Sequence, residues 1–192
     1  MTGYKNIGLI GASGDIGKII LDGLVASSSF NITILSRKES KANFPAGIIV
    51  RKSDFSDADL EVAFNGQDAV ISAVGAAAFG GQKNIVNAAV RSGAQRFIPS
   101  EVSSNGQNET ALKLTPFFGQ KKALLKYLKT KQSDGISWTA IATSGLLDWL
   151  KGLQCYSTPK RPVTGTSTSR LLKPPRTRSW LYWKKQQGLN GL

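Results

Sequence analysis

The sequence predicts an α/β fold built on a doubly wound parallel sheet. Over the first 145 residues, short apolar or β-branched runs alternate with segments of helical periodicity, which is typical of strands joined by crossover helices. A glycine-rich turn, Gly11–Gly17, separates the first strand pattern from the first helical one. After residue 150 neither periodicity continues. These observations predict one α/β domain over 1–150, followed by an irregular tail over 151–192.

The predicted strands are short runs that are apolar throughout or alternate with a period of two. They are expected at residues 6–10, 31–36, 47–50, 68–74, 95–99 and 136–142. Helices are expected between them, at residues 15–25, 57–64, 82–91 and 116–131. Ser56 or Asp57 is suited to cap the second helix, and Pro116 is well placed to begin the fourth.

The composition excludes several classes of site. The 192 residues include no histidine, which excludes Ser-His-Asp and Cys-His catalysis and argues against zinc, so no metal is expected. Cys155 is the one cysteine, so no internal disulfide can form and a reducing compartment is expected. No signal peptide or membrane-length apolar run is apparent. A cytoplasmic protein without a membrane partner is therefore predicted.

The positive charge is concentrated in the tail. The chain has a net charge of +13, and residues 151–192 contain nine Lys and Arg, four Pro and no acidic residue. Such a segment buries too little apolar surface to offset the entropy lost on ordering. We interpret it as disordered or non-native, for example the product of a frameshift or a mis-spliced gene model. It carries no recognisable nucleic-acid-binding module, so no nucleic-acid partner is expected.

The turn has the pattern G-x-x-G-x-x-G between a strand and a helix, which is the context of a dinucleotide-binding loop. Gly11 allows a tight turn, Gly14 lets the backbone approach a pyrophosphate, and Gly17 lets the helix pack closely on the strand. The helix N-terminus offers N–H groups and a positive dipole end to the phosphates. The predicted site therefore also includes Ser13, Asp15 and Ile16. The alternative is a βα turn that serves packing alone.

The end of the second strand suggests which dinucleotide binds. Ser36, Arg37 and Lys38 stand where an NAD-preferring site usually has a carboxylate. Arg37 could hold a 2′-phosphate through two hydrogen bonds, with Lys38 or Lys41 adding charge, so NADPH is the expected cofactor. The ordinary alternative is a solvated basic turn.

Two further pairs of residues follow predicted strands. Asp54 and Phe55 come after the third strand and could flank the adenine, although Asp54 could equally serve as a turn or cap residue. Val74 and Gly75 come at the end of the fourth strand, where small residues leave room for a cofactor or serve packing.

Lys121 is the candidate catalytic residue. Phe117, Lys121, Leu124 and Leu128 share one helix face, which is apolar apart from the lysine. A right-handed crossover begins this helix at the carboxyl edge of the sheet, beside the cofactor. A partly buried lysine there could donate a proton or polarise a carbonyl. The alternatives are a lysine that snorkels from an amphipathic face, or Lys122 in the same role.

A second lysine motif is interpreted as accidental. Tyr127 and Lys131 match the Tyr-x-x-x-Lys pair of short-chain dehydrogenases. Lys131 lies near the far end of the helix, about 15 Å beyond Lys121 along its axis. That position is away from the expected cofactor edge.

Together these residues resemble the NmrA-like and isoflavone-reductase-like group of atypical short-chain dehydrogenases. The resemblance covers about residues 3–150 and rests on Gly11–Gly17, Ser36–Lys38, Arg96–Glu101 and Thr143–Trp149. The string Arg-Phe-Ile-Pro-Ser-Glu at Arg96–Glu101 is quite specific, and Lys121 is similar to the catalytic lysine of the family. The chain departs from the family at Val102-Ser103, where Phe-Gly is common.

The resemblance implies a Rossmann fold and NADPH-dependent reduction of a small substrate, with an aromatic or other secondary metabolite expected. The substrate-binding C-terminal part of the family has no recognisable counterpart in residues 151–192, so impaired turnover is expected. Members of the group also include regulators that bind the dinucleotide without reducing anything. A non-enzymatic regulator with a protein partner is therefore the alternative.

Overall fold

The computed structural model describes residues 3–101 and 116–141. Its strands and helices alternate along the chain in the order β1 (Asn6–Ile10), α1 (Asp15–Ser27), β2 (Asn31–Arg37), β3 (Ile49–Ser53), α2 (Asp57–Phe64), β4 (Ala69–Ser72), the 3₁₀ helix η1 (Ala76–Gly81), α3 (Gln82–Arg91), β5 (Arg96–Ile98), α5 (Pro116–Lys131), the 3₁₀ helix η2 (Gln132–Asp134) and β6 (Ser137–Trp138). The predicted tail and the Thr143–Trp149 segment lie outside the described residues.

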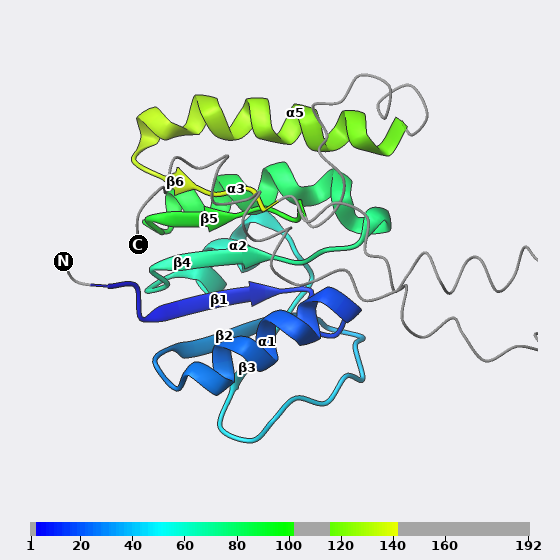
Figure 1. Cartoon of the computed structure of the whole chain (residues 1–192), viewed down its shortest axis with the longest axis vertical. Coiled ribbons are helices and arrows are strands. Elements are labelled where there is room, and N and C mark those ends of the chain that lie inside the picture. Colours follow the sequence, from blue (N-terminus) through cyan, green and yellow to red (C-terminus); the bar gives the residue numbers. More distant parts are fainter. Residues whose placement is uncertain (1–2, 102–115, 142–192) are drawn as a thin grey trace, which may run out of the picture. The chain divides into compact units, whose positions relative to one another are not determined.

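Six strands form one parallel sheet in the order β3-β2-β1-β4-β5-β6 (Figure 1). From β1 the chain builds outward in one direction through β2 and β3, and then returns to add β4, β5 and β6 on the other side. This order is that of a doubly wound Rossmann-like sheet, so the predicted fold class is confirmed.

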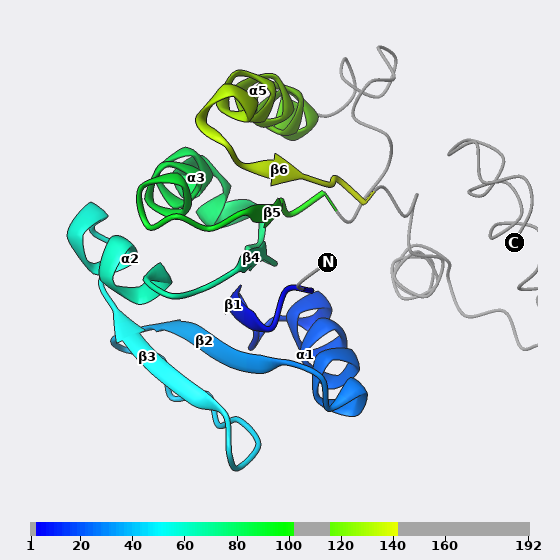
Figure 2. The ribbon, with the colours of Figure 1, turned by 90° about the vertical axis from the view of Figure 1, so that its left-hand side faces the viewer.

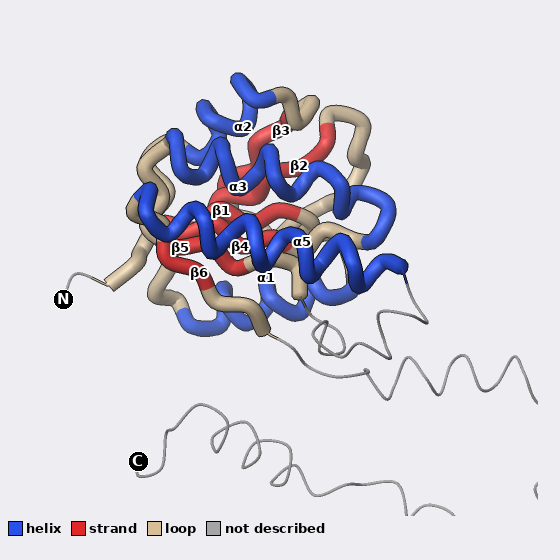
Figure 3. Tube along the Cα trace, turned by 90° about the horizontal axis from the view of Figure 1, so that it is seen from above, coloured by secondary structure: helices blue, strands red, loops and turns tan. Residues whose placement is uncertain are grey.

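Helices cover both faces of the sheet (Figure 2). On one face, Leu9 and Ile34 pack with Leu21 of α1. On the other, Ile10 and Val70 pack in a second cluster with Phe64 and with side chains of α3 and α5. The helices α2, α3 and α5 lie side by side there (Figure 3). Alternate strand residues thus enter two different cores, which explains why the central strands are apolar throughout.

The third strand was predicted at 47–50 but is observed at Ile49–Ser53, so its predicted bounds were wrong. This strand pairs with β2 alone and forms the sheet edge. Its first four residues are exposed, including the charged Arg51 and Lys52. Because an edge strand need not be apolar, hydrophobicity does not mark where it begins and ends.

Other strands are shorter than predicted. β4 ends at Ser72, because the next residues leave the ladder to run past Gly11, although the Ala73 amide still donates to the Ile10 carbonyl. β5 likewise occupies the middle of its predicted range, and β6 lies near the start of its range. The sequence did not predict η1, whose Ala and Gly residues resemble a loop. The helices were predicted more closely, and Ser56 caps α2 by accepting from the Asp59 amide.

A matched pair of substitutions in α1 tests the packing of the turn. A Cβ at Gly17 would lie 2.0 Å from the Gly11 carbonyl oxygen, whereas one at Gly23 would meet nothing within 4 Å. Gly17→Ala should therefore lower the free energy of unfolding by about 2 kcal/mol or more. Gly23→Ala should raise it by about 0.5–1 kcal/mol, because alanine favours the helix. Urea unfolding measures both, and equal effects would contradict this packing.

Candidate functional site

A cavity of ≈ 330 Å³ opens beside the carboxyl ends of β1, β2 and β4, where the strand order reverses. Ligands of open α/β sheets bind at this point. The cavity is lined by seven of the residues predicted from sequence: Gly11, Ser13, Gly14, Arg37, Phe55, Val74 and Gly75.

The three glycines of the turn differ in the space that a Cβ would find at each position. Gly11 has a φ of +79°, and a Cβ on it would lie 2.5 Å from the Ala73 carbonyl oxygen. Gly17 is prevented from carrying a Cβ by the Gly11 carbonyl. Gly14 has a φ of −77°, and a Cβ there would meet the Gly11 oxygen at an ordinary 3.4 Å. Packing within the protein therefore explains Gly11 and Gly17 but not Gly14.

The N-terminus of α1 borders the same cavity. Gly14 is the N-cap residue, and the Lys18 amide makes the first intrahelical hydrogen bond, to the Gly14 carbonyl at 2.8 Å. The amides of Asp15, Ile16 and Gly17 precede that bond and are the donors a helix terminus leaves without intrahelical partners. This end of a helix attracts anions.

The two cations after β2 are in different environments. Arg37 lines the cavity, and within the described part of the chain no ion pair engages it. Lys38 does not line the cavity, and its Nζ lies 2.9 Å from Asp54 Oδ2 and 3.8 Å from Asp59 Oδ2. The hydrogen bond to Asp54 raises the pKa of the Lys38 ammonium. Arg37, rather than Lys38, therefore presents its charge to the cavity.

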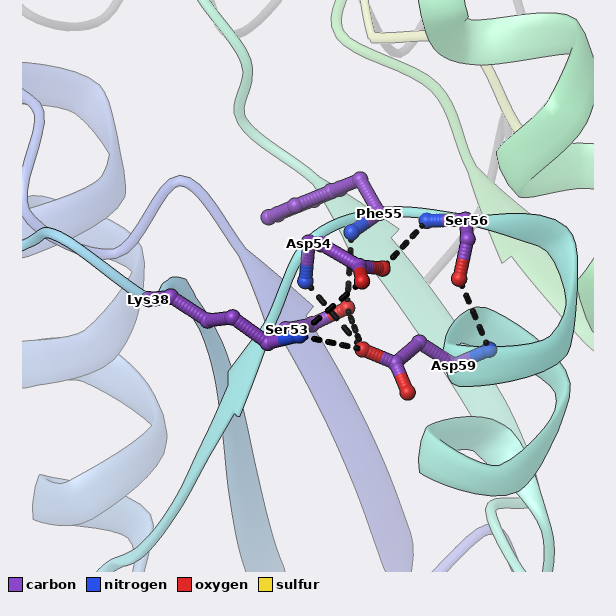
Figure 4. A network of polar contacts seen from close by, with 6 residues as sticks. All are labelled: Lys38, Ser53, Asp54, Phe55, Ser56 and Asp59. Carbon is purple, nitrogen blue, oxygen red and sulfur yellow. Dashed lines mark hydrogen bonds and ion pairs between the residues drawn. The ribbon is translucent and has the colours of Figure 1, made fainter.

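Asp54 belongs to a polar network around the start of α2 (Figure 4). Its Oδ1 accepts from the Ser56 amide at 2.9 Å, which is the turn role considered for it from sequence. Hydrogen bonds from Ser56, and then from Lys38, hold the pKa of the Asp54 carboxyl far below its usual range. Asp59 accepts from the Asp54 amide at 3.2 Å.

This network supports an unusual backbone conformation at Phe55. The residue has a φ of +64°, which is costly for a side chain with a Cβ. Its amide donates to Ser53 Oγ at 2.9 Å, and Ser53 Oγ in turn donates to Asp59 Oδ2 at 3.4 Å. Because these bonds fix the turn, the Phe55 side chain is held at the cavity wall.

Lys121 lies on the buried face of α5, as predicted. It is 4% exposed, and Leu124 and Leu128 on the same face are buried. Its Nζ lies 5.8 Å from the centre of the Phe79 ring in η1. Burial lowers the pKa of the Lys121 ammonium, while the charge of Glu101 raises it. Phe117 also occupies this face in the sequence, but the placement of its side chain lies outside the described part.

The other basic and tyrosyl candidates of α5 are placed differently. Lys122 is half-buried. Lys131 lies at the far end of the helix and forms an ion pair of 2.8 Å with Asp134. The Tyr127 hydroxyl donates to Asn87 of α3. Tyr127 and Lys131 thus make local structural contacts, in keeping with the interpretation of that motif as accidental.

Sequence reasoning did not single out Ser40 and Phe44, which are among the residues that line the cavity. Both lie in the connection between β2 and β3. Ser36, which precedes Arg37 at the end of β2, also lines the cavity. The connection has no periodic pattern, so nothing in it distinguished Ser40 or Phe44.

Comparison with known proteins identifies the family. Residues 11–171 match a family described as NAD(P)H-binding. The chain belongs to this NAD(P)H-binding family. It is also similar to two curated fungal proteins, Oxidoreductase aprR of Aspergillus flavus and Oxidoreductase poxI of Penicillium oxalicum.

The identity to aprR is 41% over 143 residues, which cover 73% of this chain and 48% of aprR. The identity to poxI is 31% over 140 residues, which cover 72% of this chain and 44% of poxI. The chain thus spans about half the length of the curated relatives it matches.

Solved structures share the NAD(P)H-binding fold. AtPrR2 with NADP⁺ and (+)pinoresinol has a TM-score of 0.60 at 20% identity, over 74% of this chain and 50% of that one. An isoflavone reductase has a TM-score of 0.59 at 22% identity, over 73% and 49%. A leucoanthocyanidin reductase from Vitis vinifera has a TM-score of 0.58 at 23% identity, over 71% and 46%.

The cavity fits NAD(P)H. The space left beside Gly14 and the donor end of α1 suit a pyrophosphate. Within residues 3–101 and 116–141, no helix is long and apolar enough to cross a membrane. The same residues contain no cluster of three or more His, Cys, Asp and Glu that could hold a metal.

The contrast among the glycines gives a prediction about binding. Gly14→Ala should weaken NADPH binding about tenfold or more, since its methyl group would occupy space beside the phosphate donors and disturb a charge-assisted hydrogen bond. The fold should be retained, because the backbone of Gly14 suits alanine. Fluorescence titration with NADPH measures the affinity, with Gly23→Ala as the control. Unchanged affinity in Gly14→Ala would place the phosphates elsewhere.

Proposed function

We propose that this chain is the dinucleotide-binding part of an NADPH-dependent reductase of the isoflavone-reductase-like kind, acting on a small aromatic secondary metabolite. The observation that carries the proposal is a buried lysine, Lys121, on a helix that follows the cofactor-binding strands. Burying an ammonium group is costly, so a buried lysine at this place in the fold favours a chemical role.

Each of the predicted site residues would contact a different part of the dinucleotide. The amides of Ser13, Asp15 and Ile16, with the space beside Gly14, would hold the pyrophosphate. Arg37 would bind the 2′-phosphate. In the same arrangement Phe55 would border the adenine, while Val74 and Gly75 would border the ribose and nicotinamide half. Lys38 would act indirectly, by neutralising Asp54 so that no uncompensated carboxylate repels the phosphate.

Lys121 would complete the reduction. When bound, NADPH supplies a hydride to the substrate. The Lys121 ammonium would donate a proton to the substrate oxygen, while the hydride adds to the carbonyl carbon. The carbonyl is thereby reduced to an alcohol. Because burial lowers its pKa, the ammonium gives up a proton more readily than a surface lysine does.

The substrate class is suggested by the names of structural neighbours. They include an isoflavone reductase, a leucoanthocyanidin reductase and a protein solved with (+)pinoresinol, and all three names refer to small aromatic compounds. The curated relatives named oxidoreductases support redox chemistry without specifying a substrate.

The cofactor preference depends on Arg37. The unmutated chain should bind NADPH more tightly than NADH, and Arg37→Ala should remove most of the difference. A charged contact to the phosphate is worth about 1.5–3 kcal/mol, which corresponds to about tenfold or more in Kd. Arg51→Ala is the matched control, because Arg51 is an exposed arginine on the next strand that does not line this cavity. Calorimetry measures the affinities, and equal Kd values for the unmutated chain would contradict the preference.

The catalytic role is tested by comparing two lysines on one helix. Lys121→Met should reduce the rate of NADPH oxidation with an aromatic carbonyl substrate by about 10²-fold or more, because the proton donor is lost. Lys131→Met should leave the rate nearly unchanged, since Lys131 pairs with Asp134 at the far end of α5. NADPH affinity should change little in both. If the unmutated chain binds NADPH but turns over no such substrate, the reductase proposal fails and a dinucleotide-binding regulator is favoured.

A further inference from the structure

Phe55 stands between two cavities. Together with Val74 and Ala78 it lines the cofactor cavity of ≈ 330 Å³, and the same three residues line a second cavity of ≈ 270 Å³. Side chains of α2 and α3, among them Leu60 and Ile85, complete the wall of the second cavity. Close contact with neighbours is what fixes a core side chain, so a ring with open space on both sides is not confined by packing alone. Another constraint is needed to hold Phe55 in place.

That constraint lies in the backbone. Phe55 has a φ of +64°, a conformation that costs free energy for any residue with a Cβ. Its amide donates to Ser53 Oγ at 2.9 Å, and Ser53 is 2% exposed. Without this hydrogen bond the backbone would relax towards negative φ, and the direction of the Phe55 side chain would change with it. The bond to Ser53 therefore sets the direction of the ring.

Asp59 orients the hydroxyl group that accepts this bond (Figure 4). Its Oδ2 accepts from Ser53 Oγ at 3.4 Å and from the Asp54 amide at 3.2 Å. A serine hydroxyl carries one hydrogen, and an ionised carboxylate can only accept. Ser53 therefore donates its hydrogen to Asp59 and keeps a lone pair for the Phe55 amide. Asp59 thus holds the residue before Phe55 directly, and Phe55 itself through Ser53.

Asp59 is itself fixed from two sides. It lies in the first turn of α2, and its amide donates to the N-cap oxygen, Ser56 Oγ, at 3.4 Å. Its Oδ2 also lies 3.8 Å from Nζ of Lys38, which follows β2. Asp59 is not among the residues that line the cofactor cavity. Any structural effect of Asp59 on a bound cofactor is therefore transmitted by the residues that it holds.

We propose that Asp59 is a positioning residue for the adenine half of the cofactor, because it holds Phe55 as the wall between the two cavities and keeps the ring against the adenine. This rests on the proposed function, which places Phe55 beside the adenine. Without the acceptor of Asp59 the turn relaxes, the ring moves into the second cavity, and the adenine loses its aromatic neighbour. Binding is then weakened although no residue that lines the cofactor cavity has been replaced.

The first measurement follows the Phe55 ring without any ligand. The full chain is labelled with fluorophenylalanine, and the ¹⁹F signal of Phe55 is assigned by its loss in Phe55→Leu. In Asp59→Ala this signal should shift or broaden. In Asp59→Asn, which is as uncharged as alanine but keeps an acceptor oxygen, the signal should stay close to its original position. A Phe55 signal that is the same in Asp59→Ala and in the unmutated chain would overturn the proposal.

Asp57→Ala is the matched control for the ¹⁹F measurement. Asp57 lies in the same first turn of α2, and its Oδ2 lies 4.0 Å from Nη2 of Arg91. The substitution therefore removes an equal charge from the same end of the helix without touching the bonds to Ser53 and Asp54. The Phe55 signal should not move, and a shift as large as that in Asp59→Ala would show a general effect of the helix terminus and overturn the proposal.

Binding of adenosine 2′,5′-bisphosphate, measured by calorimetry, then tests the effect on the adenine. Asp59→Ala and Asp59→Asn remove the same charge, so the difference between their Kd values separates the hydrogen bonds from the attraction of the phosphates. Asp59→Ala should bind the probe about fivefold or more weakly than Asp59→Asn, because contact between a base and an aromatic ring contributes at least that factor.

A double-mutant cycle shows whether Asp59 acts through Phe55. In the Phe55→Ala background, Asp59→Ala and Asp59→Asn should bind the probe equally, since a residue that acts through the ring has no effect once the ring is gone. A difference that persists in this background would show an effect independent of Phe55, and would overturn the proposal. If the unmutated chain binds no adenosine 2′,5′-bisphosphate although the ¹⁹F signal moves as expected, the link between Asp59 and Phe55 stands, while the cofactor assignment fails and the role toward the adenine fails with it.

A second variant keeps the test valid if Asp59→Ala does not fold. Ser53→Ala removes the oxygen to which the Phe55 amide donates, and leaves the charge of Asp59 in place. It should move the ¹⁹F signal of Phe55 and weaken the binding of adenosine 2′,5′-bisphosphate in the same way. Either an unchanged signal or an unchanged Kd in Ser53→Ala would overturn the proposal independently.

Discussion

The arrangement of the domain depends on one close contact, between the Gly11–Gly17 turn and the end of β4. The chain leaves β1, reverses and enters α1 within a few residues, and it does so against the Ala73 carbonyl and the first turn of the helix. A single Cβ at Gly11 or Gly17 would overlap backbone atoms by more than any side-chain adjustment could relieve. This contact fixes α1 over one face of the sheet. It also leaves the carboxyl ends of β1 and β4 open, and the cavity lies there.

Ion pairs, rather than backbone packing, determine which charges face that cavity. Arg37 and Lys38 are adjacent in sequence and both positively charged, yet Lys38 is neutralised by Asp54 and Asp59 while Arg37 lines the cavity. The acids that distinguish them come from beyond β3, after an intervening connection and strand. The same network holds Phe55 in its left-handed conformation. One group of hydrogen bonds next to the cofactor site therefore both neutralises Lys38 and holds the strained backbone of Phe55.

This explains how much the sequence alone could predict. The fold class and the helices followed from the alternation of strand and helix patterns, and the buried face of α5 followed from its helical spacing. The central strands could be recognised because burial on both sheet faces makes them apolar throughout. The bounds of β3 did not follow, since an edge strand tolerates Arg51 and Lys52. The pairing of Lys38 and the burial of Glu101 also could not be predicted. The pairing of Lys38 depends on side chains from different elements, and the burial of Glu101 depends on the tertiary fold. Neither leaves a pattern in the local sequence.

The stability of the core does not require a lysine at position 121, which is buried. Taking an ammonium group out of water is costly unless the group is paired and hydrogen-bonded. The surrounding core already supplies Leu124, Leu128 and Phe79, so an apolar residue at position 121 would extend a cluster that exists. Stability therefore does not account for a lysine there. The charge is better explained by the proposed role of Lys121 as a proton donor, which an apolar side chain cannot fill.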